Sequence, residues 1–333
     1  MQVRLLARDV SPARALFVLL ALVASSLTAV ATSTPTADAL GNAGFHPLTP
    51  ARVLDTRDGT GAPRAKVGQA GSLELDVVGV GGVPNEHVSG VVLNVTAVLP
   101  DHASHITVWP TGVTRPVASN LNVQPGDIAP NLVVVKVGAD GKVSLFNNEG
   151  NVDLIADVVG WFDDGSLAGD RFAGVTPARI LDTRDGIGGP ATRFGPAAAR
   201  DLDVTGVGGV PATGASAVVL NVTAVNGSAT SHVTVWPKGL ARPDASNLNF
   251  FAGKVRPNLV VVKIGADGSV SLFNNSGNVD LIADVVGWFG PEGTIGLSGG
   301  GFQGVTPARV LDTREAIGGP LLKIGPRPPA RSR

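Results

Sequence analysis

Short apolar segments separated by turn residues recur along the chain. Valine, leucine, isoleucine and threonine are concentrated at residues 53–56, 90–98, 106–109, 132–137, 143–146 and 152–162. Runs of this length and composition favour β-strands. No segment shows the apolar period of 3.6 residues that indicates a helix. The pattern therefore predicts about eight short strands in every 120 residues or so, which suits an all-β protein.

The expected strands suit antiparallel β-sandwich or barrel-like modules. Residues 132–137 and 143–146 flank an Asp140-Gly141 turn, and this arrangement predicts a β-hairpin. Residues 132–135 are apolar on both faces, so we expect this strand to lie in the centre of a sheet.

Residues 45–162 and 172–289 form an internal repeat. They align without a gap, and about two in three positions are identical. Residues 131–162 differ from their counterparts at few positions, as packed strands would, whereas residues 65–74 differ at most positions, as an exposed loop would. We expect two tandem β modules at 45–162 and 172–289.

The motif TPARVLDTR, once with isoleucine for valine, opens each repeat and then occurs a third time. The copies lie at 49–57, 176–184 and 306–314. In one account the third copy begins a truncated repeat over residues 302–333. In the other it closes the preceding module, so that Asp280 and Asp284 face the third copy instead of the second. We favour the first account, because residues 45–162 already hold both halves of the expected charge pairing.

The amino-terminal end resembles a secretory signal peptide. Arg4, Arg8 and Arg14 precede or open an apolar run at 15–30, and small residues follow. We expect cleavage after Ala39, which makes 1–39 the signal peptide. The rival interpretation is a retained membrane anchor. A span of the membrane requires about 20 apolar residues, and this run has 16. The mature protein is expected to have no transmembrane segment and to be extracellular or associated with the cell wall. At the other end, the proline- and arginine-rich tail is expected to be disordered.

Composition removes several classes of function. The 26 basic and 27 acidic residues are balanced and form no basic stripe, which argues against nucleic acid as a partner. The chain has no cysteine, so disulfides and cysteine-based metal sites are excluded. The 44 glycines and 24 prolines agree with many turns between short strands.

The motifs resemble a tandem module of secreted actinobacterial proteins. The similarity is carried by the segments PARVLDTRDGTG, LDVVGVGGVP, VVLNVTAV, TVWP, RPVASNLN, NLVVVKVGADGKVSLFNN and VDLIADVVGWF. Such modules are often found beside peptidoglycan amidases and other extracellular hydrolases. The resemblance covers nearly all of 45–325 and implies a secreted, envelope-associated accessory role. It supplies no ligand and no catalytic residues, and no hydrolase domain accompanies the modules.

Charged residues in apolar surroundings form the first candidate cluster. Asp153 and Asp157 lie four apart in an apolar strand, so both face the same side. Buried carboxylates need partners, and Arg52 and Arg57, together with Asp55, are available. We expect a charge clasp between the first and last strands. In the second repeat the same clasp involves Arg179, Asp182, Arg184, Asp280 and Asp284.

Tryptophans and asparagines form a second candidate set, as ligands for a sugar. Aromatic faces stack on sugar rings and amides bind hydroxyls, although core tryptophans and turn asparagines are the commoner roles. Trp109 precedes Pro110 at a strand end, which favours its exposure. The expected ligand-binding residues are Trp109, Asn120 and Asn122, with Trp236, Asn247 and Asn249 in the second repeat.

Other chemistry finds little support. Ser104 and His105 are adjacent on a strand and point to opposite faces, which disfavours a catalytic pair. A metal at His102 and His105 is disfavoured because Ala229 replaces His102 in the second repeat. A cation site at Asp55 and Asp58 lacks the spacing of a calcium loop. We expect no catalytic residues, no metal and no cofactor.

The sequence thus predicts a non-catalytic binding or adhesion protein. The expected target is cell-wall glycan or peptidoglycan, bound through two weak sites that gain avidity from sharing a chain. One alternative is a structural surface protein whose modules bind each other or another surface protein, and a weaker one is a cell-wall hydrolase. The short linkers between modules allow either a rigid or a loose arrangement.

Overall fold

A computed structural model describes residues 43–294, 301–302, 304–305, 309–322 and 325. Sixteen strands joined by turns make up this part of the chain, and it contains no helix, so the predicted all-β class is confirmed. Accordingly, no helix in the described part is long and apolar enough to cross a membrane. The predicted signal peptide and most of the carboxy-terminal tail lie outside the described residues.

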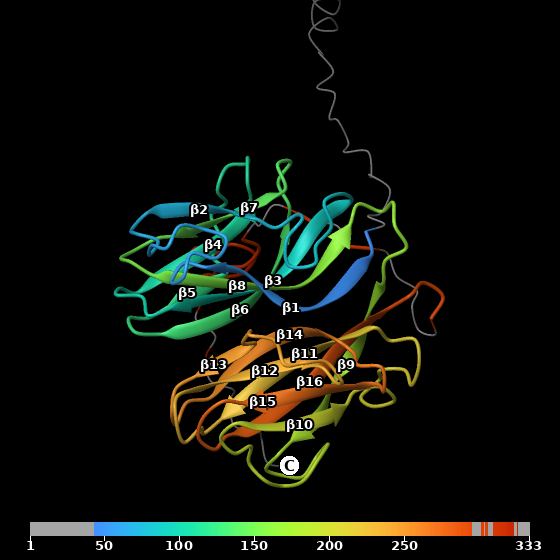
Figure 1. The fold of residues 1–333 in the computed structure, drawn as a ribbon. Helices are drawn as coiled ribbons and strands as arrows, with labels where there is room; N and C mark the ends of the chain where they lie inside the picture. Colours follow the sequence, from blue (N-terminus) through green and yellow to red (C-terminus); the bar gives the residue numbers. More distant parts are fainter. Residues whose placement is uncertain (1–42, 295–300, 303, 306–308, 323–324, 326–333) are drawn as a thin grey trace, which may run out of the picture. The chain divides into compact units, whose positions relative to one another are not determined.

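Module 1, which comprises strands β1–β8, is a sandwich of two antiparallel four-stranded sheets (Figure 1). The first sheet has the order β1-β8-β3-β6 and consists of β1 (Phe45–Asp55), β8 (Asp153–Asp163), β3 (Val88–Val98) and β6 (Ile128–Lys136). The second has the order β2-β7-β4-β5 and consists of β2 (Gly71–Asp76), β7 (Lys142–Asn147), β4 (Ser104–Pro110) and β5 (Leu121–Val123). Leu54, Leu93 and Leu145 are fully buried in its apolar core.

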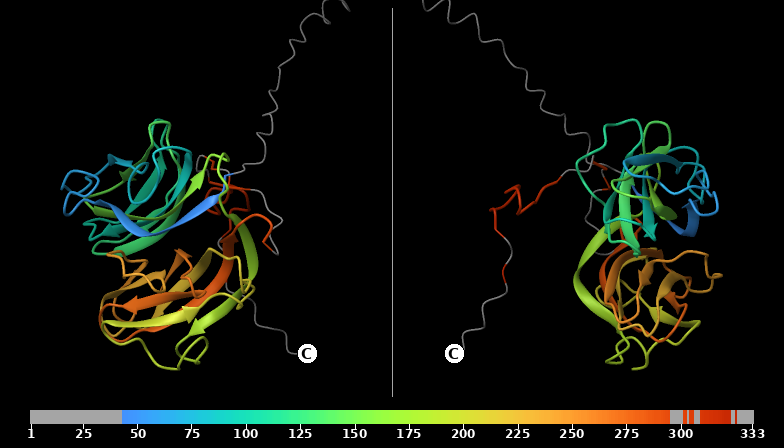
Figure 2. Two further views of the ribbon diagram at one scale, coloured as in Figure 1. Left: turned by 45° about the vertical axis from the view of Figure 1, so that its right-hand side comes forward. Right: turned by 90° about the vertical axis from the view of Figure 1, so that its left-hand side faces the viewer.

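Module 2, which comprises strands β9–β16, repeats this topology. One sheet has the order β14-β11-β16-β9 and consists of β14 (Arg256–Lys263), β11 (Ala217–Val225), β16 (Asp280–Gly290) and β9 (Arg171–Asp182). The other has the order β10-β15-β12-β13 and consists of β10 (Ala198–Asp203), β15 (Ser269–Asn274), β12 (Ser231–Pro237) and β13 (Leu248–Phe250). The two layers of each module can be followed in the turned views of Figure 2. The tandem sandwich architecture is therefore as predicted.

The predicted hairpin after β6 is wrong. β6 pairs with β3 in one sheet, whereas β7 pairs with β2 and β4 in the other. The Asp140-Gly141 turn exists, with φ of 80° at Gly141, but it carries the chain from one sheet to the other. An Asp-Gly pair supplies a backbone of positive φ to either kind of turn, so the dipeptide alone could not separate them.

β6 is also an edge strand, not the central strand that its two apolar faces predicted. The second apolar face has another cause, which is visible in the matched strand β14. There Val261 is buried in an apolar cluster that contains residues of both modules. A strand at the edge of one sheet can therefore be covered on both faces when its outer face meets a neighbouring module.

The two modules pack through the outer faces of their first sheets, within one compact unit of residues 40–333. The shared apolar cluster includes Phe45, Val92, Val159 and Phe162 from module 1 and Val219, Val261 and Phe289 from module 2. The rings of Phe45 and Phe289 lie 4.2 Å apart. Beside them, Asn94 Nδ2 donates to the Ser246 carbonyl oxygen at 2.6 Å. The sequence left the packing of the modules open, and the structure joins them through this third core.

Candidate functional site

The motif forms the same charged turn in all three copies. In the first copy, Asp55 Oδ1 accepts hydrogen bonds from the backbone nitrogen and Nε of Arg57, at 3.0 and 2.9 Å. Asp55 Oδ2 accepts from Arg57 Nη2 at 2.7 Å and from Arg52 Nη1 at 3.3 Å. The bond from Arg57 is the main cause that lowers the pKa of Asp55, so the turn is held by an ionised carboxylate between two guanidinium groups. Matching contacts join Asp182 to Arg179 and Arg184, and Asp312 to Arg309 and Arg314.

A second set of contacts links the motif strand to the last strand of the same module. Arg52 Nε donates to Asp157 Oδ1 at 3.0 Å, and in module 2 Arg179 Nε donates to Asp284 Oδ1 at 2.9 Å. The Asp157 side chain is 2 % exposed, whereas that of Asp284 is 26 % exposed, because module 2 covers only the first pair. Burial raises the pKa of Asp157, and the adjacent guanidinium opposes the shift. Keeping this aspartate ionised therefore costs more free energy in module 1, where it is buried, than in module 2.

The remaining aspartates of the expected clasp have other partners. Asp153 accepts from Thr56 Oγ1 at 2.9 Å and from Lys66 Nζ at 2.6 Å, while Arg57 bonds to the aspartate of its own turn. The matched contacts in module 2 join Asp280 to Thr183 and Arg193. Each module therefore contains an arginine–aspartate pair between the motif strand and the last strand, and a local arginine–aspartate turn within the motif. Asp284 faces the second motif copy, which is the pairing that the first account of the third copy predicts.

The alternative of a cation at the motif has no support in the contacts. Asp55 is engaged by both arginines, and Asp58 Oδ1 accepts from the backbone nitrogen of Thr60 at 2.9 Å. Within the described residues, no group of three or more histidine, aspartate or glutamate side chains is arranged to hold a metal ion.

The expected sugar-stacking tryptophans are buried. Trp109 and Trp236 are each 7 % exposed, and their Nε1 atoms donate to the carbonyl oxygens of Val113 and Leu240 at 3.1 and 3.0 Å. A following proline marks the end of the strand, but the loop after it folds back over the indole. The expectation that Trp109 is exposed is therefore wrong, and neither ring offers a face to a ligand.

The expected asparagines divide into two roles. Asn120 Oδ1 accepts from the Val108 backbone nitrogen at 2.7 Å, and Asn247 Oδ1 accepts from that of Val235 at the same distance. The side-chain oxygens of these two residues therefore fix the loops before β5 and β13. The other two expected residues, Asn122 and Asn249, line pockets.

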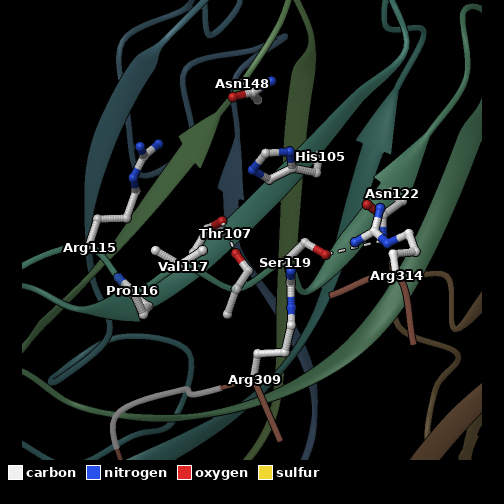
Figure 3. Close-up of a pocket in the computed structure, with 11 residues that line it drawn as sticks. His105, Thr107, Arg115, Pro116, Val117, Ser119, Asn122, Asn148, Arg309 and Arg314 are labelled. Carbon is white, nitrogen blue, oxygen red and sulfur yellow. Dashed lines mark hydrogen bonds between the residues drawn. The ribbon is translucent and has the colours of Figure 1, made fainter. Parts of the chain in front are cut away.

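A pocket of about 550 Å³ lies on the outer face of the second sheet of module 1 (Figure 3). Its described walls consist of His105, Thr107, Arg115, Pro116, Val117, Ala118, Ser119, Asn122, Asn148, Arg309 and Arg314. Arg309 and Arg314 come from the third motif copy and point toward Ser119 and Asn122, while Arg115 lies on the opposite side (Figure 3). The third copy thus places two guanidinium groups against a polar face of module 1.

The pocket of module 1 is cationic and lacks acidic lining residues. Three guanidinium groups and one imidazole line it, and none of its lining residues is aspartate or glutamate. The guanidinium of Arg115 lies 3.4 Å above the ring centroid of Phe146, which fixes its position. Burial, together with the charges of Arg115 and Arg309, lowers the pKa of His105. The imidazole is therefore neutral at pH 7 and becomes easier to protonate when an anion enters.

A second pocket, of about 230 Å³, occupies the equivalent face of module 2. Here the first motif copy supplies Arg52 and Arg57, which face His232 and Asn249, the counterparts of His105 and Asn122. The main difference is at one position, because Asp244 stands where module 1 has Val117. Burial opposes the charge on Arg52, but its bond to Asp157 and the nearby carboxylates, Asp244 among them, raise its pKa. The described lining of the smaller pocket contains two guanidinium groups and one carboxylate, whereas that of the larger pocket contains three guanidinium groups and no carboxylate.

Sequence reasoning identified Asn122 but missed the residues around it. His105, Arg115, Ser119 and Asn122 are all identical in the second repeat, so the internal comparison carried a signal. However, many other positions are also identical in the two repeats, so identity alone does not mark these residues as a site. The approach of Arg309 and Arg314 depends on long-range packing and left no local trace.

No family description matches the sequence, and no curated protein matches it. Among solved structures, the chain is similar to the N-terminal CBM22-1-CBM22-2 tandem domain of Xyn10C from Paenibacillus barcinonensis. The identity is 11 % and the TM-score is 0.20, and the match covers 73 % of this chain and 98 % of that one. A match of this size supports no argument about the ligand.

Proposed function

We propose that this chain is a secreted, non-catalytic binding protein that holds an acidic polysaccharide of the cell envelope in the pocket of module 1. The observation that carries the proposal is the cation-rich, acid-free lining of that pocket. Guanidinium groups match the planar geometry of carboxylates and phosphates and bind them with paired hydrogen bonds. Arg115, Arg309 and Arg314 approach from different sides, which suits a ligand with more than one oxygen acceptor.

The rest of the lining suits the neutral part of a sugar. Ser119 and Asn122 offer a hydroxyl and an amide beside the guanidinium groups, and Thr107 and Asn148 add further polar groups. Pockets of about 300–1,000 Å³ hold small ligands, so the volume of about 550 Å³ suits one or two acidic sugar units. Uronic acids and the lactyl or peptide carboxylates of peptidoglycan both belong to this class.

Because module 2 carries Asp244 in its smaller pocket, we infer one anion-binding site in each chain instead of the two equal sites first expected. Binding by a single chain is then weak, and avidity requires several chains on the same polymer. The expected signal peptide places the protein outside the cytoplasm, where acidic envelope polymers occur.

Two contacts argue against hydrolysis at this face. The hydroxyl of Ser104 donates to Asn147 Oδ1 at 2.7 Å and accepts from the backbone nitrogen of Glu149 at 2.9 Å, so it is held as part of a turn. The same arrangement recurs at Ser231 and Asn274. His105 shares its pocket with three arginines, and among the described residues no carboxylate lines that pocket to orient the imidazole. A general acid–base pair of carboxylates, as glycoside hydrolysis needs, does not line the pocket.

Isothermal titration of the full chain with polygalacturonate, a neutral β-glucan and inorganic phosphate tests the proposal. We expect polygalacturonate to bind more tightly than inorganic phosphate, the neutral β-glucan to give no heat of binding, and the protein to be retained on purified cell walls. Affinity should rise as the pH falls from about 7.5 to 5.5, because a bound carboxylate raises the low pKa of His105 and binding then takes up a proton. Equal binding of neutral and acidic glycans, or release of shorter fragments from either polymer, would contradict the proposal.

A further inference from the structure

The interface between the modules has two different sides. Module 1 contributes what we name the leading face, which includes Phe45, Arg52, Asn94 and Asp157. Module 2 contributes the receiving face, which includes His232, Ser246, Val261 and Phe289. Phe45 packs on Phe289 at 4.2 Å, and Asn94 binds Ser246 O at 2.6 Å and accepts from Asn258 Nδ2 at 2.9 Å. Because both modules have the same fold and sequence pattern, each one has both kinds of face.

No other module covers the leading face of module 2 within the described part of the chain. Phe172, the counterpart of Phe45, is 47 % exposed, whereas Phe45 is 1 % exposed. Asn221, the counterpart of Asn94, makes no side-chain hydrogen bond with any described residue, and Val286 is only half-buried. The residues that module 1 buries in the interface thus have counterparts in module 2 that no partner module covers.

The receiving face of module 1 is covered only in part. Phe302 and the described part of the third motif copy, residues 309–314, contact it: Phe302 stacks on Phe162 with ring centroids 4.1 Å apart, and Arg309 and Arg314 line the pocket. Val134 nevertheless stays 45 % exposed, whereas its counterpart Val261 is 5 % exposed beneath module 1. Phe302 and residues 309–314 therefore make the contacts that the motif of a leading face would make, but they leave the adjoining apolar surface exposed.

We propose that the open leading face of module 2 binds the receiving face of module 1 in a second copy of this chain, and that Phe302 together with residues 309–314 is a removable cap on that receiving face. The occupant follows from the interface within the chain, because the two unsatisfied surfaces are counterparts of two surfaces that already bind each other. Phe172 takes the place of Phe302 on Phe162 of the second copy. Arg179 and Arg184 take the places of Arg309 and Arg314, so the anion pocket is rebuilt at the junction.

This association goes beyond the proposed binding of a glycan and needs no ligand. It is head-to-tail, since a leading face meets a receiving face and never its own kind. The cap and the second copy compete for one surface, so loss of the cap should strengthen association. Such assembly would give the several chains on one polymer that avidity requires.

Sedimentation velocity of the full chain over a wide range of concentration tests the proposal. We expect concentration-dependent self-association, strengthened at least about tenfold in Phe302→Asp and abolished in Phe172→Asp. Leu99→Asp is the matched control, because Leu99 is also exposed and is not among the residues named for either face, and it should behave as the unaltered chain. A monomer for both the unaltered chain and Phe302→Asp, or association that persists in Phe172→Asp, overturns the proposal. Polygalacturonate binding in a monomeric chain would leave the proposed function intact.

The absence of cysteine allows a second measurement that reports the register directly. Because Asn94 contacts Ser246, the proposal places Asn221 of one copy beside Ser119 of the other. Mixing Asn221→Cys chains with Ser119→Cys chains under mild oxidation should give the mixed disulfide well above either homodimer. Mixing Ser119→Cys with Leu99→Cys chains is the control and should give no such preference. Equal yields of all pairings would refute the predicted register.

Discussion

An aspartate at position 117 should weaken anion binding, because it copies into module 1 the carboxylate that module 2 carries in its own pocket. Val117 is 84 % exposed, so the substitution disturbs no packing. A carboxylate about 6 Å from the bound anion, at an effective dielectric constant between 20 and 80, repels it by about 0.7–2.8 kcal/mol. Affinity should therefore fall roughly 3- to 100-fold. The repulsion should weaken with added salt.

The assay is titration with polygalacturonate, with Val117→Asn as the control because asparagine has the shape of aspartate without its charge. Val117→Asn should bind as the unaltered chain does. The reverse change, Asp244→Val, should give module 2 a weak anion site. Equal affinity of the Asp and Asn variants would show that the ligand does not bind beside position 117, and the reasoning from the pocket charge would be refuted.

Three further predictions concern the charge pairs and the tryptophans. Arg52→Met should destabilise the chain by about 3 kcal/mol in urea denaturation, because it leaves a buried carboxylate unpaired; Arg179→Met, at the exposed counterpart, should cost below about 1 kcal/mol. The hydrogen bond from Arg184 is the main cause that lowers the pKa of Asp182 to about 2. The ionised Asp182 therefore stabilises the folded chain above about pH 4, and this contribution is lost as the pH falls toward 2. Acid titration of Arg184→Gln should show a smaller loss of stability over this range. Polygalacturonate should leave tryptophan emission unchanged, since Trp109 is buried, and a large shift would contradict the assigned site.

The sequence predicted those features that depend on local pattern. The strands, the tandem arrangement of two modules and the pairing of Arg52 with a strand aspartate follow from apolar runs, internal identity and the need of a buried charge for a partner. The order of strands within the sheets did not follow. The turn at Asp140 and Gly141 can close a hairpin or connect two sheets, and only the pairing of β6 with β3 separates these possibilities.

The candidate site was the less predictable part for a physical reason. Trp109 and Asn122 were chosen by residue type, yet burial by a loop removed the first and left the second. Arg309 and Arg314 lie about 200 residues from the strand that they face, and no local rule relates such segments. The single difference between Val117 and Asp244 was visible in the repeat alignment, but its meaning required knowing that arginines face both positions.

The most direct test of the binding site is a map of the bound ligand on the full chain. In a ¹⁵N nuclear magnetic resonance titration with tri-galacturonate, we expect the largest shifts at the His105 ring, the Asn122 amide and the guanidinium Nε of Arg115 and Arg309. The equivalent signals of His232 and Asn249 should move little. Shifts centred on module 2, or spread evenly over the surface, would contradict the assignment of the site to the cation-rich pocket of module 1.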